Sequence, residues 1–362
     1  MGTPKTQLSQ GEDCLNLVVA SPGRDGRRPV MVFFHGGAFV SGGGLLDWYD
    51  GSALAAEANV VVVSVNYRLG VFGYLCLDGI SEGNLGLLDQ VESLRWVREN
   101  IADYGGDPTN VTVFGQSAGA VSIRLLMEMP EARGLFVKAI LQSGPGSELA
   151  RTRESAESVG RAFLGTLGDD PRNAAVDALL RAQREVSAVL AHDHATVAPA
   201  FYPASGTESL PTLDADFSAN VRGLAVLCGW NADDASAFVG PDDDVVVATH
   251  QMVAQPVGEL ARRLALAGAS ARTYRLDWRP AGSAYGATHC VELPLLLGSR
   301  RSWEPCPMLG HTSWADVAKL GRELRRIWGR FAHTGGVDIK NSEALPVVWD
   351  PELVGMPNFV PT

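Results

Sequence analysis

The sequence predicts an α/β protein with a mostly parallel, doubly wound sheet and helices on both faces. Short apolar runs recur along the 362 residues, and helical or glycine-rich connections separate them. Most of these runs are apolar throughout, as strands buried on both faces of a parallel sheet are. One run leads through a Gly-x-Ser-x-Gly turn, residues 115–119, directly into a helical pattern.

The expected elements follow from these patterns in chain order. The apolar runs predict strands at Leu15–Ala20, Val30–Phe34, Val60–Val65, Val111–Phe114, Lys138–Gln142, Ala225–Cys228 and Thr273–Leu276. Apolar residues at helical spacing predict helices at Leu87–Ile101 and Trp314–Thr334. Turn-forming residues predict that Asp103–Asn110 is a turn, which ends the first of these helices. We expect one domain over residues 1–362, with a helical excursion over the catalytic edge at 151–216, of which His192–Asp216 is loop.

The amino-acid composition limits the classes of partner that the protein is expected to bind. A formal net charge of −11 disfavours nucleic acid and anionic membranes, which reward clustered Lys and Arg, and leaves a neutral small molecule as the expected partner. The 5 cysteines form no C-x-x-C pair, and no apolar run reaches transmembrane length. We therefore expect a cytoplasmic protein, monomeric or weakly homo-oligomeric.

The turn at residues 115–119 places Ser117 on a nucleophile elbow. Glycines at 115 and 119 allow a tight turn that exposes the serine hydroxyl above the sheet edge. Ala118 opens the following helix, so its N–H is free to meet an oxyanion. A Gly-Gly pair follows the Val30–Phe34 strand, where the N–H groups of the next residues can converge on the same oxygen. His35, just before that pair, is expected to be structural.

A serine needs a base, and the base needs an acid that fixes its tautomer. His289 follows a late strand in a loop and is the expected base, with His311 as the alternative. Asp233 and Asp234 both follow the Ala225–Cys228 strand, and spacing does not separate them. His192 and His194, taken as part of an extended segment, lack a third ligand, so we expect neither a metal nor a cofactor.

The sequence resembles the type-B carboxylesterase family, which includes cholinesterases and bacterial p-nitrobenzyl esterases. Matching stretches extend over residues 12–147: Glu12–Leu17, His35–Phe39, Asn66–Gly70, Gly83–Gln90, Gly105–Pro108, Gly115–Gly119 and Leu141–Gly144. Two further motifs match at Gly229–Phe238 and Gly286–Leu293. The resemblance implies an α/β-hydrolase fold.

The resemblance also implies roles for single residues. The nucleophile falls on Ser117, the acid on Asp234 and the base on His289. The oxyanion donors fall on the N–H groups of Gly37, Ala38 and Ala118, and we expect Gln116 and Phe39 to contact substrate.

Three features depart from the family pattern. Gln116 stands where Glu is usual before the serine, Asp234 replaces a Glu, and residues 235–288 form a shorter segment than relatives carry, so a reduced cap is expected. The implied activity is a serine carboxylic-ester hydrolase that acts through an acyl-enzyme. The alternatives are an acyl-transferring, lactone-opening or cyclising enzyme with the same triad and, less in keeping with an intact triad, a non-catalytic binding scaffold.

Overall fold

A mostly parallel sheet forms the centre of the protein. The structure, a computed structural model, describes residues 8–144, 146, 149–194, 199–214, 217–240, 242–337 and 345–350, without the side chains of 192–194. Within these residues the sheet has 8 strands in the order β1-β3-β2-β6-β7-β10-β11-β12. They are β1 (Leu17–Ala20), β2 (Arg28–Phe34), β3 (Val61–Val65), β6 (Gly106–Gln116), β7 (Lys138–Gln142), β10 (Ala225–Asn231), β11 (Ser270–Leu276) and β12 (Val347–Trp349). The two outer strands, β1 and β12, pair antiparallel and the others parallel.

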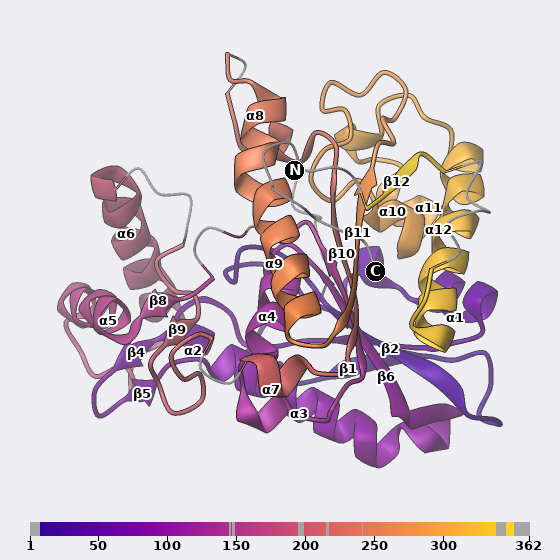
Figure 1. Cartoon of the computed structure of the whole chain (residues 1–362). Coiled ribbons are helices and arrows are strands. Elements are labelled where there is room, and N and C mark those ends of the chain that lie inside the picture. Colours follow the sequence, from indigo (N-terminus) through magenta and orange to yellow (C-terminus); the bar gives the residue numbers. More distant parts are fainter. Residues whose placement is uncertain are drawn as a thin grey trace.

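Helices cover both faces of the sheet (Figure 1). The longer ones are α1 (Ser52–Ala58), α3 (Leu85–Asn100), α4 (Ala118–Leu126), α5 (Arg153–Leu167), α6 (Val176–His194), α9 (Gln255–Leu266) and α12 (Trp314–Thr334). Short helices are α2 (Gly70–Tyr74), α7 (Phe217–Val221), α8 (Val245–Thr249), α10 (Leu293–Leu296) and α11 (Arg300–Trp303). Two small ribbons pair β4 (Cys76–Leu77) with β5 (Ser81–Glu82) and β8 (Arg151–Thr152) with β9 (Ala204–Ser205). The α/β-hydrolase fold is thereby confirmed.

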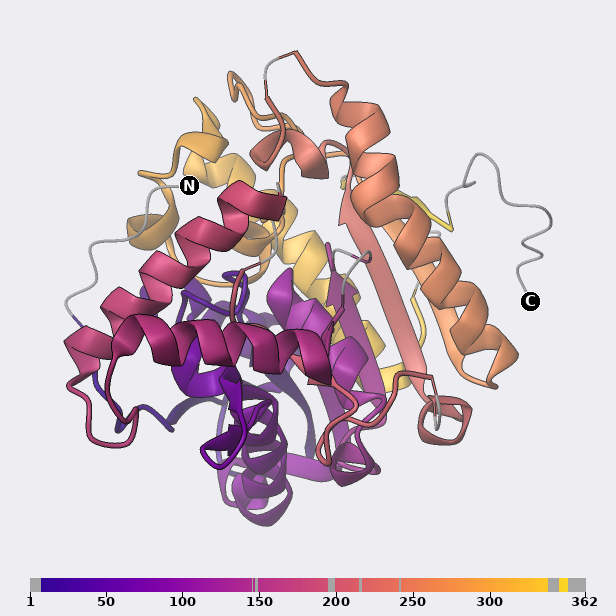
Figure 2. The same cartoon turned by 90° about the vertical axis from the view of Figure 1, so that its left-hand side faces the viewer.

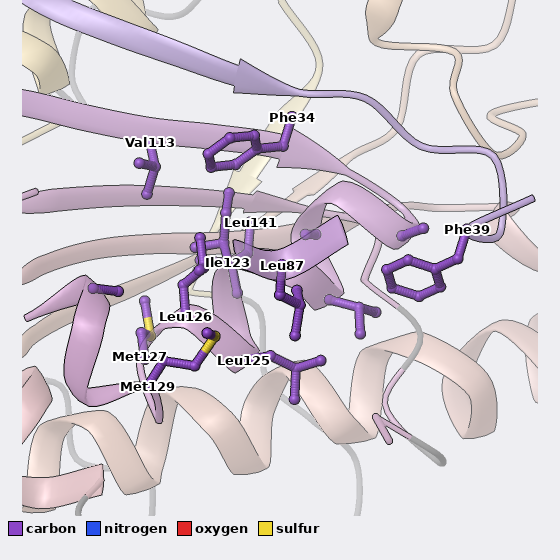
Figure 3. Close-up of a cluster of buried hydrophobic side chains, with 14 of the residues drawn as sticks. Phe34, Phe39, Leu87, Val113, Ile123, Leu125, Leu126, Met127, Met129 and Leu141 are labelled. Atoms are coloured by element: carbon purple, nitrogen blue, oxygen red, sulfur yellow. The ribbon is translucent and has the colours of Figure 1, made fainter. Parts of the chain in front are cut away.

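The alternation of side chains along β2 divides the core into two clusters. Val30, Val32 and Phe34 belong to the cluster that includes side chains of α3, α4 and α9, while Met31 and Phe33 belong to the cluster that includes side chains of α1 and α12. Figure 3 shows part of the first cluster, where Ile123, Leu125 and Leu126 of α4 meet Val113 and Leu141 of the sheet. Helix α4 thus buries apolar side chains directly below the elbow that it continues.

The segment after β7 forms a separate layer of helices beside the sheet (Figure 2). Helix α5 begins at the Thr152 cap, whose hydroxyl accepts the Ser155 N–H, and α5 ends at Gly168 with a positive φ of 70°. The Gln183 side chain of α6 accepts the Val71 N–H of α2 at 2.7 Å. The expectation that His192 lies in an extended loop is wrong, because α6 continues to His194.

A second expectation also fails. Residues Asp103–Asn110 were expected to be a turn, but the turn is complete at Gly105, whose φ is 78°, and β6 begins at Gly106. The Gly106–Asn110 part of β6 is polar, so the apolar-run criterion does not detect it. None of the described helices combines the length and the apolar character that a bilayer crossing requires.

Candidate active site

Ser117 occupies a strained turn between β6 and α4. Its φ of 56° and ψ of −123° are costly for a residue with a side chain, and such strain is typical of functional turns. The positions of the two flanking glycines have no room for a side chain. A Cβ on Gly119 would lie 2.0 Å from the Phe34 carbonyl oxygen, and one on Gly115 would lie 2.7 Å from the Gly119 carbonyl carbon. The Ser117 N–H donates to Gln142 of β7 at 2.9 Å, which ties the elbow to the sheet edge.

The loop after β2 turns its backbone toward the elbow. Gly37, Ala38 and Phe39 all have positive φ, at 121°, 52° and 62°. A Cβ on Gly37 would lie 2.1 Å from the Ser41 carbonyl oxygen, so glycine is required there. Within the described residues the N–H groups of Gly37 and Ala38 have no hydrogen-bond acceptor. The Ala118 N–H, at the start of α4, precedes the first intrahelical bond.

The loops after β10 and β11 bring an acid and a histidine together. His289 Nδ1 lies 2.6 Å from Asp234 Oδ1, and both side chains are buried. Because a carboxylate only accepts, Nδ1 donates, and a neutral His289 then has its lone pair on Nε2. The second oxygen of Asp234 accepts the Asn231 N–H at 3.0 Å. This pair is the general-base arrangement that a serine nucleophile requires.

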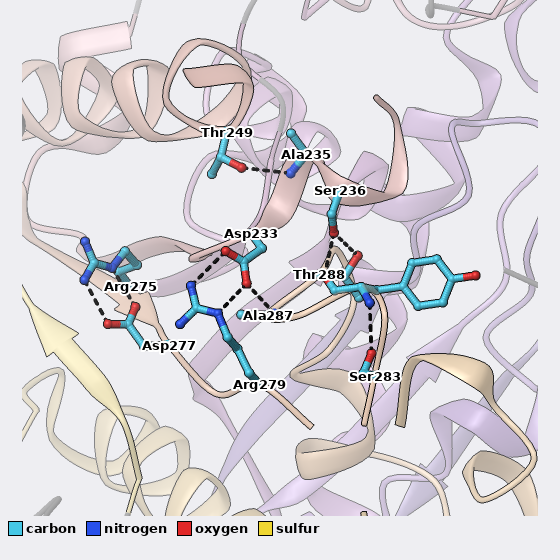
Figure 4. Close-up of polar contacts among 11 residues, drawn as sticks. Asp233, Ala235, Ser236, Thr249, Arg275, Asp277, Arg279, Ser283, Ala287 and Thr288 are labelled. Carbon is cyan, nitrogen blue, oxygen red and sulfur yellow. Dashed lines mark hydrogen bonds and ion pairs between the residues drawn. The ribbon is translucent and has the colours of Figure 1, made fainter. Parts of the chain in front are cut away.

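Asp233 has a different set of partners (Figure 4). Its carboxylate accepts two hydrogen bonds from the Arg279 guanidinium, at 2.7 and 2.8 Å, and one from the Ala287 N–H at 2.7 Å. Ala287 is two residues before His289, so Asp233 anchors the histidine loop. The two adjacent carboxylates, which spacing did not separate, therefore differ in what they contact.

A buried glutamate lies beneath the acid. Glu292 accepts hydrogen bonds from Asn231 Nδ2 at 2.6 Å and from Gln142 Nε2 at 3.2 Å. Burial raises the pKa of the Glu292 carboxyl, the Asn231 hydrogen bond opposes that rise, and nearby Asp234 adds to it. Sequence reasoning gave this residue no role, although it lies within the matched motif at 286–293.

Three other histidines have different surroundings. His35 is fully buried and stacks on Tyr67 with ring centroids 4.4 Å apart, and burial lowers its pKa to about 4. His311 packs beside Gly282, and His333 lies exposed on α12. Across the residues that the structure covers, no group of three His, Cys, Asp or Glu side chains is arranged to hold a metal ion.

Gln116 and Phe39 have distinct surroundings. Gln116 is buried at the end of β6, and its Nε2 lies 3.0 Å from His289 Nε2. The Phe39 ring is buried and packs edge-on against Tyr74, with ring centroids 5.2 Å apart. Phe238, which sequence reasoning also left without a role, packs edge-on against the His289 ring at 4.8 Å and is 46% exposed.

Comparison with known proteins gives consistent matches. The carboxylesterase family matches residues 1–246. The chain is 41% identical to a probable N-octanoylanthranilate hydrolase of Rhodococcus erythropolis, over 93% of this chain and 79% of that protein. It is 37% identical to the para-nitrobenzyl esterase of Bacillus subtilis strain 168, over 90% of this chain and 75% of that protein. A solved p-nitrobenzyl esterase structure superposes with a TM-score of 0.81 and 33% identity, covering 94% of this chain and 80% of the other.

Proposed function

The chain belongs to the carboxylesterase family and is a serine ester hydrolase, and from that premise we propose that Ser117, His289 and Asp234 form its catalytic triad. His289 Nε2 takes the hydroxyl proton as Ser117 Oγ attacks the acyl carbon, and Asp234 stabilises the resulting imidazolium. The observation that carries this proposal is the 2.6 Å contact of His289 with the buried Asp234 carboxylate.

Three backbone N–H groups serve as the oxyanion hole in this proposal. Gly37, Ala38 and Ala118 donate to the oxygen that becomes negative when Ser117 adds to the carbonyl. Support comes from the positive φ of Gly37 and Ala38, which leaves both N–H groups without an acceptor among the described residues. Such donors, already oriented, need no rearrangement as charge develops.

The reaction then proceeds in two halves. His289 returns its proton to the leaving alcohol, which departs as an acyl-enzyme forms on Ser117 Oγ. A water molecule, deprotonated by the same His289, attacks the acyl carbon and releases the acid, and the proton on His289 returns to Ser117. Each proton is accounted for within the triad, and the sequence of steps requires no cofactor.

The substrates are small-molecule esters, and we propose that the enzyme accepts esters that carry an aromatic group. The names of both curated relatives contain an aromatic component, anthranilate and nitrobenzyl. The exposed Phe238 ring beside His289 offers such a group a surface to pack on. We propose that Phe39, which directly follows the oxyanion residues, and Gln116, which lies beside His289, contact the substrate.

We infer that residues 1–362 act as one hydrolase domain, with 151–216 as an excursion beside the catalytic edge. The contact of Gln183 in α6 with α2 supports this inference. So does the bond from the Gly70 N–H of α2 to the Phe39 carbonyl, at 2.7 Å. We also propose that the protein is a monomer or a weak homo-oligomer in the cytoplasm. The five free cysteines agree with that location, because cytosolic thiols are kept reduced.

A fluorophosphonate probe tests the nucleophile directly. The native protein should be labelled at Ser117 and should hydrolyse p-nitrophenyl acetate, and Ser117→Ala should lose both properties. Ser122→Ala is a matched control, because Ser122 lies one turn along α4 and its hydroxyl bonds to Ala118 and Gln90 rather than facing the edge. Hydrolysis retained by the Ser117→Ala protein would refute the mechanism.

A further inference from the structure

The imidazole of His289 has a second polar partner besides Asp234. The amide nitrogen of Gln116 lies 3.0 Å from His289 Nε2, and both side chains are buried. With Nδ1 donating to Asp234, the lone pair of a neutral imidazole is on Nε2, and it accepts from the Gln116 amide. Within the described residues no hydrogen bond joins Ser117 Oγ to His289.

The backbone holds Gln116 in this place. It is the last residue of β6 and pairs with Gln142 of β7, so the sheet sets its position. Its Oε1 faces the loop of the oxyanion residues, where a Cβ on Gly36 would lie only 2.8 Å away. The side chain therefore spans the gap between Gly36 and His289, and glycine at position 36 makes room for it.

A single lone pair cannot serve two donors well. The Nε2 lone pair that accepts from Gln116 is the same one that must take the Ser117 proton. We propose that Gln116 is a positioning residue, whose amide holds the His289 imidazole in place in the resting enzyme and yields Nε2 to Ser117 during catalysis. This inference rests on the triad proposed above.

The proposal predicts how the charge at position 116 acts on the base. An amide N–H bonds to neutral Nε2 but not to a protonated Nε2–H, so it disfavours the imidazolium. A carboxylate there cannot donate and would favour the imidazolium instead. The other titratable groups near this site are the carboxyls of Asp234 and Glu292, the Cys290 thiol and the Tyr274 hydroxyl. Of these, only the Cys290 thiol has a hydrogen bond with the Gln116 side chain among the causes of its pKa shift, and because burial raises the pKa of this thiol it stays neutral over the acid limb.

Two substitutions and one control test the role. With a neutral p-nitrophenyl ester, Gln116→Glu should move the acid limb of the kcat/KM profile upward by about one pH unit or more. Gln116→Met, of similar length and without an amide, should move it upward by less. KM should change less than about threefold in both variants, because the proposed role is on the base rather than on ground-state binding.

The matched control is Gln90→Met. Gln90 lies in α3, and its buried amide donates to Ser122 Oγ at 3.2 Å rather than to His289. Its acid limb should coincide with that of the native enzyme. An acid limb for Gln116→Glu within about 0.3 pH unit of the native one would overturn the proposal. So would a change confined to KM, which would make Gln116 a substrate contact only.

An NMR titration keeps this inference separate from the proposed function. The imidazole nitrogens of His289 can be followed in resting protein, assigned by comparison with His289→Gln, without any turnover. Gln116→Glu should move the His289 titration to higher pH even in a Ser117→Ala background. An unchanged titration refutes the positioning role, whereas active Ser117→Ala protein refutes the triad; if the Glu variant fails to fold, Gln116→Met carries the test.

Discussion

Acid should destabilise the protein through His35, which immediately precedes the oxyanion loop. The imidazole is fully buried, and its Nδ1 donates to the Gly36 carbonyl at 2.8 Å. Its Nε2 has no hydrogen-bond partner among the described residues. Protonation would create a charged N–H facing no acceptor, and burial accordingly lowers the pKa of His35 to about 4, against the opposing effect of the Gly36 bond.

The sign and size follow from proton linkage. With a folded pKa of about 4 and an ordinary value of 6.5, the unfolded chain binds more protons between these values. The stability contribution is therefore complete above pH 6.5 and is lost as the pH falls toward 4. Between pH 7.5 and pH 5 this one group should remove about 2 kcal/mol from the free energy of unfolding.

Urea unfolding of the native protein and His35→Gln at pH 7.5 and pH 5, followed by tryptophan fluorescence, measures this loss. The substitution changes stability at both pH values, so the comparison is the difference between them. That difference should be about 2 kcal/mol smaller in the variant, because the carboxylates titrate alike in both proteins. His333→Gln, at an exposed histidine on α12, should keep the native pH dependence. An equal loss in native and His35→Gln protein would refute the reasoning.

Three further predictions concern the acids and the substrate range. Asp234→Asn should lower kcat/KM for p-nitrophenyl acetate by about 10³–10⁴, because the imidazole loses the carboxylate that sets its tautomer. Asp233→Asn should cost less than about tenfold, since an Asn oxygen still accepts from the histidine loop, and equal losses would reverse the assignment. Burial raises the pKa of the Glu292 carboxyl. The contribution of this group to the free energy of unfolding is therefore complete below its ordinary pKa of 4.5 and is lost as the pH rises. Glu292→Gln should therefore raise Tm more at pH 8 than at pH 5, and a Tm difference independent of pH would contradict this. The short segment between Asp234 and His289 predicts a wide entrance, so kcat/KM for at least one bulky aromatic ester should lie within about 10³ of that for the acetate; stronger rejection of every such ester would indicate a closed pocket.

The elements with strong local signals could be predicted well. Strand β7 and helix α12 have the expected bounds. The first is a short apolar run bounded by turns, and the second begins at the Ser313 cap and ends at Gly335 in the left-handed region. The elbow was equally visible, because its two glycines are required by the close approach of backbone atoms.

Features that depend on tertiary contacts could not be predicted. In the polar start of β6 only Gly106 pairs with a neighbour, Arg28 of β2, and the register shifts before the next pair, Val30 with Val111. Strand β12 is only three half-buried residues long. Asp233 and Asp234 look alike in sequence, and only the positions of Arg279 and Ala287 give the first different partners. The contact of Gln116 with His289 joins positions 173 residues apart, and no local pattern reports it.

The order of strands across the sheet has a consequence for how activity is acquired during folding. The oxyanion loop and the elbow follow β2 and β6, neighbouring strands that both lie in the first third of the chain. Asp234 and His289 follow β10 and β11, which come much later in the sequence. During synthesis the ribosome releases the nucleophile well before the residues that activate it. A newly made chain would therefore carry a serine on its elbow without a base, and esterase activity would appear only when β10 and β11 have joined the sheet.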